Sequence, residues 1–263
     1  MPALLDPELH ERIHHLWDEL ATFEAARNED ALMFLLSAVA RMIDAQNAYW
    51  MGAVRLTDDK RDPLLGWRPR LIRYLHPLPN DRKYTRRRMR SLQRAQTVDE
   101  ATVAQARLAG TFRACRLRDL VSADWFKSDT YRLGYLGRGV HGSLTVGVPV
   151  SPITEAYYGF LRMRENDPFT EAQRDLAFHA MRGLMWFHRQ VLLAHGVSAA
   201  STPLSPMERR VLALLLTDKS EKLIAAALGV TPSSAHTYVR GVLRKFGVSG
   251  RSGLIALWLG RQN

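Results

Sequence analysis

Short polar side chains and arginines share one face of a helix that the sequence predicts over residues 232–245. Ser233, Thr237, Arg240 and Arg244 follow one another at intervals of three and four residues, and His236 lies beside them. Side chains at these intervals lie on one helix face. Hydroxyl groups near the helix start can reach base edges, and guanidinium groups further along can bind phosphates. This is the chemistry of a helix that enters the DNA major groove N-terminus first. The alternative is an ordinary solvated helix surface.

The ends and the opposite face of this helix are also marked in the sequence. Thr231 is a capping residue, Pro232 occupies the first helical position, and Gly247 is a stop signal. The opposite face is apolar at helical spacing, so we expect it to pack against partner helices. The residues of that face are Ala235, Val239, Val242 and Phe246.

Two shorter helices precede it and a fourth follows. Ser205 and Glu208 have the spacing of a capping box around Pro206, which starts the first of these helices. Ser220 starts the second and Gly229 ends it, and a last helix is expected over residues 252–259. Lys and Arg outnumber Asp and Glu from residue 203 to 263, which favours a polyanionic partner.

The segment 204–259 resembles the four-helix DNA-binding domain of LuxR-type transcription regulators. The resemblance rests on Leu204-Ser205-Pro206, Glu208, Val211-Leu212, Ser220, Ile224-Ala225, Leu228-Gly229-Val230, Val239, Leu243, Lys245, Gly247-Val248 and Arg251-Ser252. It implies that the helix over 232–245 reads double-stranded DNA and that the last helix carries a dimer contact. The residues it assigns to DNA contact are Lys222, Ser233, Ser234, His236, Thr237, Arg240, Arg244 and Lys245.

Four positions depart from the pattern of that family. His236 stands where a lysine is usual and Tyr238 where a histidine is usual, while Leu223 replaces a glutamate and Asp218 a glycine. Loss of the lysine removes a permanent positive charge from the phosphate-contacting set. The fold expectation is unaffected, but the base preference of the family cannot be carried over.

The whole chain has the composition of a globular protein with two domains. Its 263 residues are 46% hydrophobic and 24% charged, with a net charge of +11. Its one cysteine, Cys115, excludes an intramolecular disulfide framework and fits a reducing cytoplasm. The N-terminus lacks the pattern of a secretory signal, and the longest apolar run, 31–40, is too short to span a bilayer. We therefore expect a cytoplasmic protein without a membrane partner.

The N-terminal part reads as an α+β domain with helices on both sides of a sheet. Helices are expected over 7–27, 29–44, 84–95, 98–108 and 169–194, and strands over 48–56, 71–75, 112–117, 143–150 and 156–164. This order resembles GAF/PAS-like α-β-α and autoinducer-type sensor domains. The residues that carry it are 117–121, Trp125-Phe126, 139–150 and 167–171. The expected domains are a sensor and dimerisation domain at 1–195, a linker at 196–203 and the helix-turn-helix domain at 204–263.

Aromatic residues suggest a ligand pocket between this sheet and its helices. Tyr49, Trp50, Trp125, Tyr131 and Tyr135 are the candidate lining residues, and the alternative is that they simply fill the core. The sequence holds no CxxC, HExxH or GxSxG motif and no phosphate-binding glycine loop, so no catalytic residue, metal site or cofactor is predicted.

The segment 81–118 is the most basic part of the chain. The run Arg86-Arg87-Arg88 could bind phosphate, of DNA or of a ligand, or it could be a solvated helix face, which is the more common role of such runs. The preferred function is a homodimeric DNA-binding regulator with a small-molecule or partner-sensing domain. The alternatives are a constitutive regulator with a structural dimerisation domain and an enzyme with an accessory DNA-binding tail.

Overall fold

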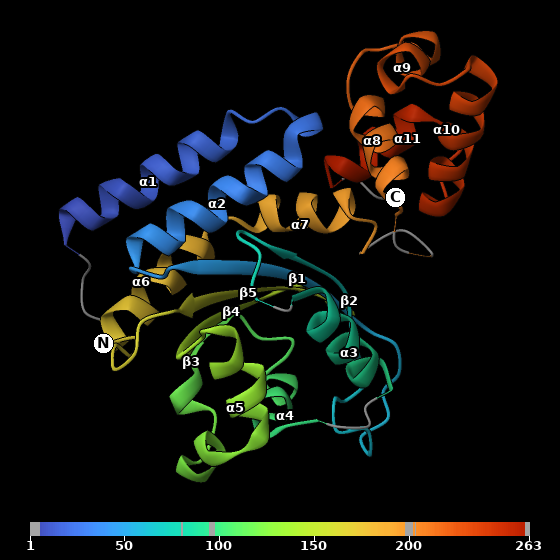
Figure 1. Ribbon diagram of the computed structural model, residues 1–263. Helices are drawn as coiled ribbons and strands as arrows, with labels where there is room; N and C mark the ends of the chain where they lie inside the picture. Colours follow the sequence, from blue (N-terminus) through green and yellow to red (C-terminus); the bar gives the residue numbers. More distant parts are fainter. Residues whose placement is uncertain (1–5, 80, 95–97, 198–201, 203, 261–263) are drawn as a thin grey trace. The chain divides into compact units, whose positions relative to one another are not determined.

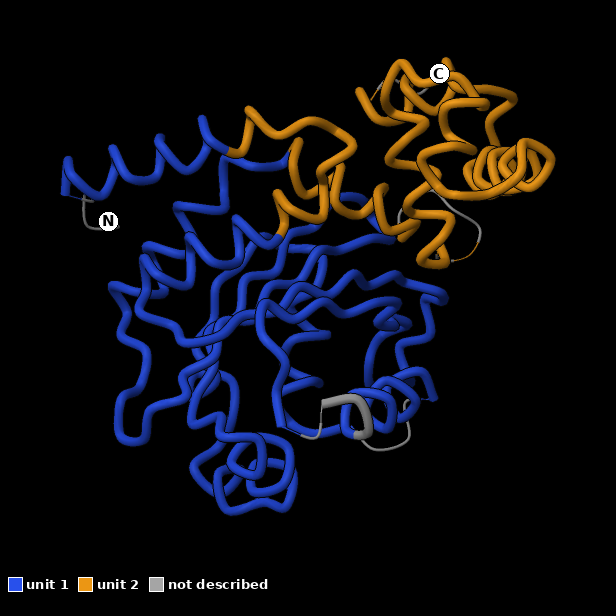
Figure 2. Tube along the Cα trace, turned by 45° about the horizontal axis from the view of Figure 1, so that its top comes forward, with its two compact units in different colours: residues 1–19, 33–185 blue, residues 20–32, 186–263 orange. Residues whose placement is uncertain are grey.

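The computed structural model describes residues 6–79, 81–94, 98–197, 202 and 204–260. Contacts between residues divide the chain into two compact units, drawn in different colours in Figure 2. Unit 1 comprises residues 1–19 and 33–185, and unit 2 comprises residues 20–32 and 186–263. Most of the predicted linker, 198–201 and 203, lies outside the described residues. Within the described ranges, every helix is too short or too polar to cross a bilayer.

Unit 1 is built on a five-stranded antiparallel sheet. The strands are β1 (Asn47–Arg55), β2 (Trp67–Tyr74), β3 (Arg113–Arg116), β4 (Gly142–Ser151) and β5 (Thr154–Arg162), and their order in the sheet is β2-β1-β5-β4-β3. Together with the surrounding helices this confirms the α+β class. The strands expected from the sequence are present, with β2 beginning four residues before the predicted 71–75 segment.

Helices cover both faces of this sheet (Figure 1). The helices α2 (Asn28–Met42) and α6 (Glu171–Arg182) lie on one face, with α1 (Pro7–Ala21) outside α2. The helices α3 (Asp81–Arg94), α4 (Glu100–Arg107) and α5 (Asp129–Gly134) lie on the other. Because side chains alternate along a strand, each strand contributes to both layers.

The α2–α6 face of the sheet is a closed apolar layer. Trp50 of β1 lies opposite Tyr158 of β5, and both side chains are completely buried. Leu144 and Val146 of β4 and Phe160 of β5 are likewise fully buried. Such continuous burial is expected for a sheet face covered by helices, and it leaves this layer to stabilise the fold by apolar packing.

The helix predicted over 169–194 is two helices, and Trp17 explains the break. The helix α6 ends at Arg182 and α7 (Met185–Ala194) begins three residues later. The Trp17 ring lies against Gly183, where a Cβ atom would come within 2.7 Å of it, and the indole N–H donates to the Ala180 carbonyl at 2.7 Å. A distant residue therefore satisfies a carbonyl in the last turn of α6 and occupies the space beside it.

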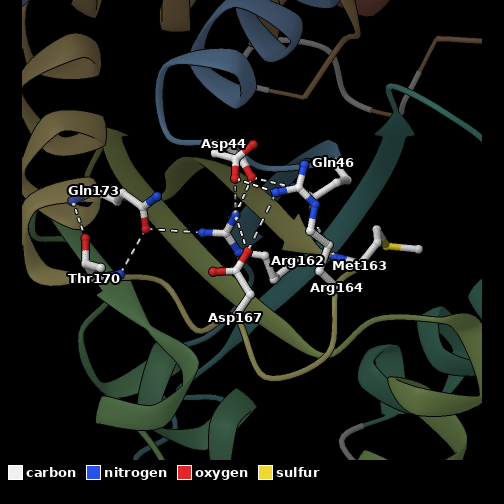
Figure 3. Close-up of polar contacts among 8 residues, drawn as sticks. All are labelled: Asp44, Gln46, Arg162, Met163, Arg164, Asp167, Thr170 and Gln173. Carbon is white, nitrogen blue, oxygen red and sulfur yellow. Dashed lines mark hydrogen bonds and ion pairs between the residues drawn. The ribbon is translucent and has the colours of Figure 1, made fainter.

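A buried arginine joins three segments at one end of the sheet (Figure 3). The Arg162 side chain is 1% exposed, and its guanidinium lies 3.1 Å from the Asp44 carboxylate and 3.2 Å from that of Asp167. It also donates to the Gln173 side chain at 3.2 Å and lies 4.3 Å above the centre of the Phe169 ring. These contacts tie the turn after α2, the end of β5 and the start of α6 together.

Unit 2 contains four short helices around an apolar core. They are α8 (Pro206–Leu215), α9 (Glu221–Leu228), α10 (Pro232–Phe246) and α11 (Arg251–Trp258). The unit also includes the 3₁₀ turn Ala25–Arg27 and helix α7. Its core is formed by buried residues from these helices and by Leu204, which precedes α8: Leu193, Leu204, Val211, Leu212, Leu215, Ile224, Leu228, Val239, Val242, Phe246, Leu254 and Trp258.

The predicted starts of α8, α9 and α10 and the glycine stops of α9 and α10 are confirmed, while α11 lies one residue before the predicted 252–259. Ser205 and Glu208 form both hydrogen bonds of a capping box, at 3.3 Å and 2.7 Å. Ser220 and Thr231 cap α9 and α10 through their side chains. Gly229 and Gly247 end the same two helices in the left-handed conformation, with φ of +68° and +66°. Glycine adopts that conformation without steric cost, so these sequence signals determine where the chain turns.

Candidate functional sites

The first candidate site is the exposed face of α10. Ser233, Thr237, Arg240 and Arg244 are all exposed, whereas Ala235, Val239, Val242 and Phe246 on the other side are buried. The helix therefore packs in unit 2 by its apolar side and presents hydroxyl and guanidinium groups outward.

Neighbouring polar groups arrange the first turns of this face. The Thr237 hydroxyl donates to the Ser233 carbonyl at 3.0 Å, and the Thr231 hydroxyl donates to that of Ser234 at 3.0 Å. The exposed His236 ring lies 3.0 Å from the Glu221 carboxylate at the start of α9. The helix that precedes α10 in a helix-turn-helix is therefore tied to α10 by a polar contact as well as by apolar packing.

The remaining two candidates for DNA contact differ in their surroundings. Lys222 is exposed on α9. Lys245 is partly buried and forms an ion pair with Glu208 at 2.8 Å, so its ammonium group stabilises the start of α8. Leu223, which lies among the apolar residues of α9, is 55% exposed. Ile224 is fully buried and shares the inward face of α9 with Ala225 and Leu228, whereas Leu223 lies outside that face.

The second candidate site is a cavity between the sheet and α3, α4 and α5. Its volume is about 240 Å³. Tyr49, Met51 and Ala53 of β1 point into it, and Tyr157 and Leu161 of β5 lie beside them. Both sets are spaced by two or four residues along their strands, as one face of a sheet requires. Much of the lining is aromatic and aliphatic, as is common in small-molecule sites. It also carries charged side chains, namely Arg68, Arg88, Arg113, Arg138, Asp99 and Glu155.

Two of the five predicted pocket residues line this cavity. Tyr49 and Tyr135 do so. Trp50 neighbours Tyr49 in β1 and therefore points to the opposite, closed face, where it is fully buried. Trp125 packs in an aromatic cluster with ring centres 5.5 Å from both Tyr131 and Tyr135. Tyr131 lines a separate surface pocket next to Phe126 and His141.

A buried ion pair forms part of the cavity lining. The Arg113 guanidinium binds both carboxylate oxygens of Glu155, at 2.6 Å and 3.0 Å, and their side chains are 8% and 4% exposed. It also donates to the Gln105 side chain at 3.1 Å and to the Thr111 carbonyl at 3.0 Å. Gly147 on β4 leaves the space for this guanidinium, since a Cβ atom there would lie 2.4 Å from it. The pair fixes α4 against the sheet.

Tyrosine hydroxyls give the cavity much of its polar character. Burial raises the pKa of Tyr49, Tyr135 and Tyr157 well above the ordinary value, so their hydroxyls stay protonated at any physiological pH. Arg138 lies 4.4 Å from the centre of the Tyr84 ring and donates to the Tyr74 hydroxyl at 3.3 Å. The cavity therefore offers neutral tyrosine hydroxyls and charged side chains, among them Arg113, Arg138 and Glu155, beside aromatic and aliphatic surface.

Several lining residues were not recognised in the sequence. Arg113, Arg138, Tyr74, Tyr84 and Glu155 come from five separate elements, and only the sheet pairing and the helices above it bring them together. The period of two along β1 and β5 could have separated Tyr49 from Trp50, because it is a local signal. No comparable signal marks Glu155 as the partner of Arg113, which lies 42 residues away.

The chemistry available outside the two sites is limited. Within the described ranges, no three His, Cys, Asp or Glu side chains are placed to hold a metal ion. Cys115 is half-buried, and burial raises the pKa of its thiol, which lowers its reactivity.

Comparisons with known proteins agree on the C-terminal segment. Residues 202–258 match the family model of bacterial regulatory proteins of the luxR family. The transcriptional regulatory protein MctR of Rhizobium johnstonii is 38% identical over 64 residues, which are 24% of this chain and 30% of that protein. The match thus spans less than a third of the length of the curated relative.

Solved structures that resemble the chain do so at low sequence identity. SdiA in complex with octanoyl-rac-glycerol is 11% identical with a TM-score of 0.48, covering 98% of this chain and 97% of that one. Escherichia coli SdiA in the space group P6522 has a TM-score of 0.44 at 11% identity, covering 96% and 97%. The VqsR LBD domain of Pseudomonas aeruginosa has a TM-score of 0.45 at 13% identity, covering 72% and 98%.

The family assignment rests on the sequence match and on the helices observed in the matched segment. The matched residues contain α8 to α11, with their caps, turns and buried core in place. The C-terminal segment of this chain is a helix-turn-helix domain of the luxR family of bacterial regulatory proteins.

Proposed function

We propose that the protein is a cytoplasmic transcription regulator that binds double-stranded DNA through α10. The single observation that supports this most strongly is the exposed face of α10, where Ser233, Thr237, Arg240 and Arg244 lie together in a segment that matches luxR-family regulators. Hydroxyl groups at the start of the helix would contact base edges and the arginines would contact phosphates. No catalytic role is proposed for either unit.

In vitro selection tests this proposal and identifies the operator in the same experiment. Full-length protein is used to select from duplexes of random sequence, and affinities for the selected duplex are then measured by fluorescence anisotropy. Thr237→Ala and Arg240→Ala should each weaken binding about 5- to 100-fold, because a contact to a base or phosphate contributes about 1–3 kcal/mol. The control is Arg12→Ala, an exposed arginine of α1. Wild-type affinity in both variants would contradict the assigned face.

We further propose that two chains bind one operator, with α11 forming the contact between their DNA-binding domains. The apolar side chains of Ile255 on α11 and of Leu259, which caps its C-terminus, are 39% and 62% exposed, whereas Leu254 and Trp258 are buried in the core of unit 2. An exposed apolar pair on a short helix is suited to a symmetric contact.

A substitution in α11 and one elsewhere separate this role from general effects of added charge. Ile255→Glu should weaken binding to a two-fold symmetric operator while leaving the helix content unchanged. The matched control is Leu133→Glu, because Leu133 of α5 is 63% exposed. A selected DNA sequence without two-fold symmetry would contradict dimeric binding.

We propose that residues 1–195 act as a sensor domain and 204–263 as the DNA-binding domain, and that the cavity of unit 1 holds a small, largely apolar ligand. Support comes from its volume of about 240 Å³ and its lining of tyrosines and aliphatic side chains. Ligand binding would change the population of DNA-binding-competent states.

Thermal shift against a library of small molecules tests for such a ligand, because a ligand that binds the native state raises the melting temperature. Ala53→Leu is the matched variant, since it fills space on the cavity wall. It should reduce the shift produced by any hit. A hit whose shift is unchanged in Ala53→Leu binds elsewhere, and a library without hits favours a constitutive regulator.

A further inference from the structure

The exposed face of α3 is an unusually dense array of arginines. Arg86, Arg87, Arg90 and Arg94 are all exposed on this helix. At 100° per residue they occupy an arc of about 100° around the helix axis. Between positions 86 and 94 the helix rises by about 12 Å. Four guanidinium groups therefore lie along one side of little more than two helical turns.

The other side of α3 packs in unit 1, and this divides the arginine run seen in the sequence. Tyr84, Met89 and Leu92 line the cavity, together with Arg88, which forms an ion pair with Asp99 and donates to the Thr102 hydroxyl at 2.6 Å. The run Arg86-Arg87-Arg88 is thus not one functional unit. Arg88 faces inward and is neutralised, whereas its two neighbours face outward.

The outward arginines lack acidic neighbours. The sequence contains no Asp or Glu from residue 82 to residue 98. Across the described part of the chain, no carboxylate lies within ion-pair distance of Arg86, Arg87, Arg90 or Arg94. The same structure pairs Arg61, Arg116, Arg132 and Arg164 with nearby acids. Mutual repulsion on α3 is therefore left without the local compensation used elsewhere on the surface.

We propose that this arginine face of α3, formed by Arg86, Arg87, Arg90 and Arg94, is a second DNA-binding surface that contacts phosphates without reading sequence. Double-stranded DNA carries one phosphate per 3.4 Å on each strand, so the roughly 12 Å spanned by these arginines matches about four phosphates of one strand. Guanidinium groups bind phosphate oxygens by charge-assisted hydrogen bonds.

The features of the rest of the chain support duplex DNA as the polyanion that binds α3. The inference rests on the proposed function of α10, which brings the protein to a duplex and so gives α3 a high effective concentration of phosphates. The exposed residues between positions 86 and 94 are the four arginines and Gln93, and none of them is apolar. This composition suits contact with the polar sugar-phosphate backbone of DNA. Contacts outside the operator would raise affinity for the flanking duplex and would be strongly salt-dependent.

Salt titration with a matched pair of full-length variants tests this proposal. The first variant replaces all four arginines of the α3 face with Gln. The control variant carries the same loss of charge at four exposed arginines elsewhere in unit 1 that form none of the ion pairs described above, namely Arg12, Arg41, Arg107 and Arg118. Affinity for a long duplex of mixed sequence is measured from about 50 to about 200 mM KCl, and each lost phosphate contact should lower the slope of log K against log [KCl] by about 0.9.

The expected result is a slope lowered by about 2 to 4 in the α3 variant. The control variant should keep nearly the wild-type slope, and a variant with four Arg→Lys substitutions on α3 should retain most of it because the charge is kept. Circular dichroism and melting temperature establish that each variant is folded. If the fourfold Gln variant is not, the double variant Arg86→Gln with Arg90→Gln provides the test, with a slope lowered by about 1 to 2.

Three results would overturn the inference. One is an unchanged slope in the folded α3 variant while Arg240→Ala still weakens binding, which would leave the proposed function intact. Another is an equal loss in the α3 and control variants, which would indicate a general charge effect. The third is a folded α3 variant that keeps the salt slope of DNA binding but no longer binds anionic phospholipid vesicles that the wild type binds. This would indicate that the arginine face of α3 binds a membrane surface. A lowered slope in the α3 variant together with wild-type affinity in Thr237→Ala and Arg240→Ala would contradict the assigned face of α10. The same result would support DNA binding by α3.

Discussion

Arginine has opposite roles in the sheet of unit 1 and on α10 of unit 2. Arg113 is buried, makes two hydrogen bonds to Glu155 and holds α4 against the sheet. Arg240 and Arg244 are exposed on a helix whose packing is carried by its other face. A buried charge must be paired to be tolerated, and its partner is therefore part of the fold. An exposed charge is solvated, so it remains available to a partner outside the chain.

The same contrast separates the two units as a whole. Unit 1 depends on residues far apart in the chain, as in the contacts of Arg162 with Asp44 and of Trp17 with Ala180. Unit 2 has short helices that are started and ended by their own neighbours, as in the capping box of Ser205. Substitutions in the two units should therefore change the free energy of unfolding by different amounts, and in one case with opposite signs.

The largest effect is expected for Glu155→Ala. Removing the carboxylate leaves the Arg113 guanidinium buried without its charged partner, which should lower the free energy of unfolding by about 3–5 kcal/mol. Chemical denaturation followed by circular dichroism measures it. Asp59→Ala is the control, because it breaks the exposed Arg61 pair and should change stability far less. Equal effects of the two variants would remove the distinction drawn between buried and exposed arginines.

Replacing a glycine by alanine should change the free energy of unfolding in opposite directions in the two units. A Cβ atom at Gly159 of β5 would lie 2.1 Å from the Tyr49 ring, so Gly159→Ala should destabilise unit 1 by about 1–3 kcal/mol. In α10 a Cβ atom at Gly241 meets open space, so Gly241→Ala should stabilise the helix by about 0.5–1 kcal/mol. Denaturation of both variants measures the signs. A stabilised Gly159→Ala would show that Tyr49 is free to move away.

Loss of a helix cap should have a smaller effect that is confined to unit 2. The Ser205 hydroxyl accepts a hydrogen bond from the Glu208 backbone at 3.3 Å. Ser205→Ala should therefore cost about 1 kcal/mol. Hydrogen exchange of the α8 amides measures it locally, and Ser249→Ala, a serine outside the four helices, is the control. Faster exchange in the strands of unit 1 would show that the cap acts beyond its own unit.

The smallest expected effect is a dependence of stability on acid pH. Partial burial favours the neutral form of Glu208, but hydrogen bonds from Lys245 and Ser205 outweigh burial and lower its pKa below the ordinary 4.5. A lowered pKa in the folded state means that the stabilisation is present above pH 4.5 and is lost as pH falls through the folded pKa. Denaturation of the wild type and of Glu208→Gln from neutral to acid pH measures it. The variant should lose less stability over the acid range, and an identical profile would contradict the role of this carboxylate.

The extent to which the sequence was informative differs between the two candidate sites. The boundaries and faces of α10 followed from Thr231, Pro232 and Gly247 and from apolar residues at helical spacing, and the structure confirms them. The pocket residues were proposed from residue type alone. Trp50 shows why this is insufficient, since its neighbour Tyr49 lines the cavity while Trp50 lies on the closed face.

The sequence by itself determined the helix-turn-helix segment, because capping, helix termination and amphipathic spacing act over a few residues. It also determined that α3 is strongly basic. Only the tertiary structure decided which arginines of α3 face inward, which aromatic residues line the cavity, and which acid neutralises Arg113. Those outcomes depend on strand pairing and helix placement between distant parts of the chain, and no local pattern of residues encodes a contact that forms only when those parts meet.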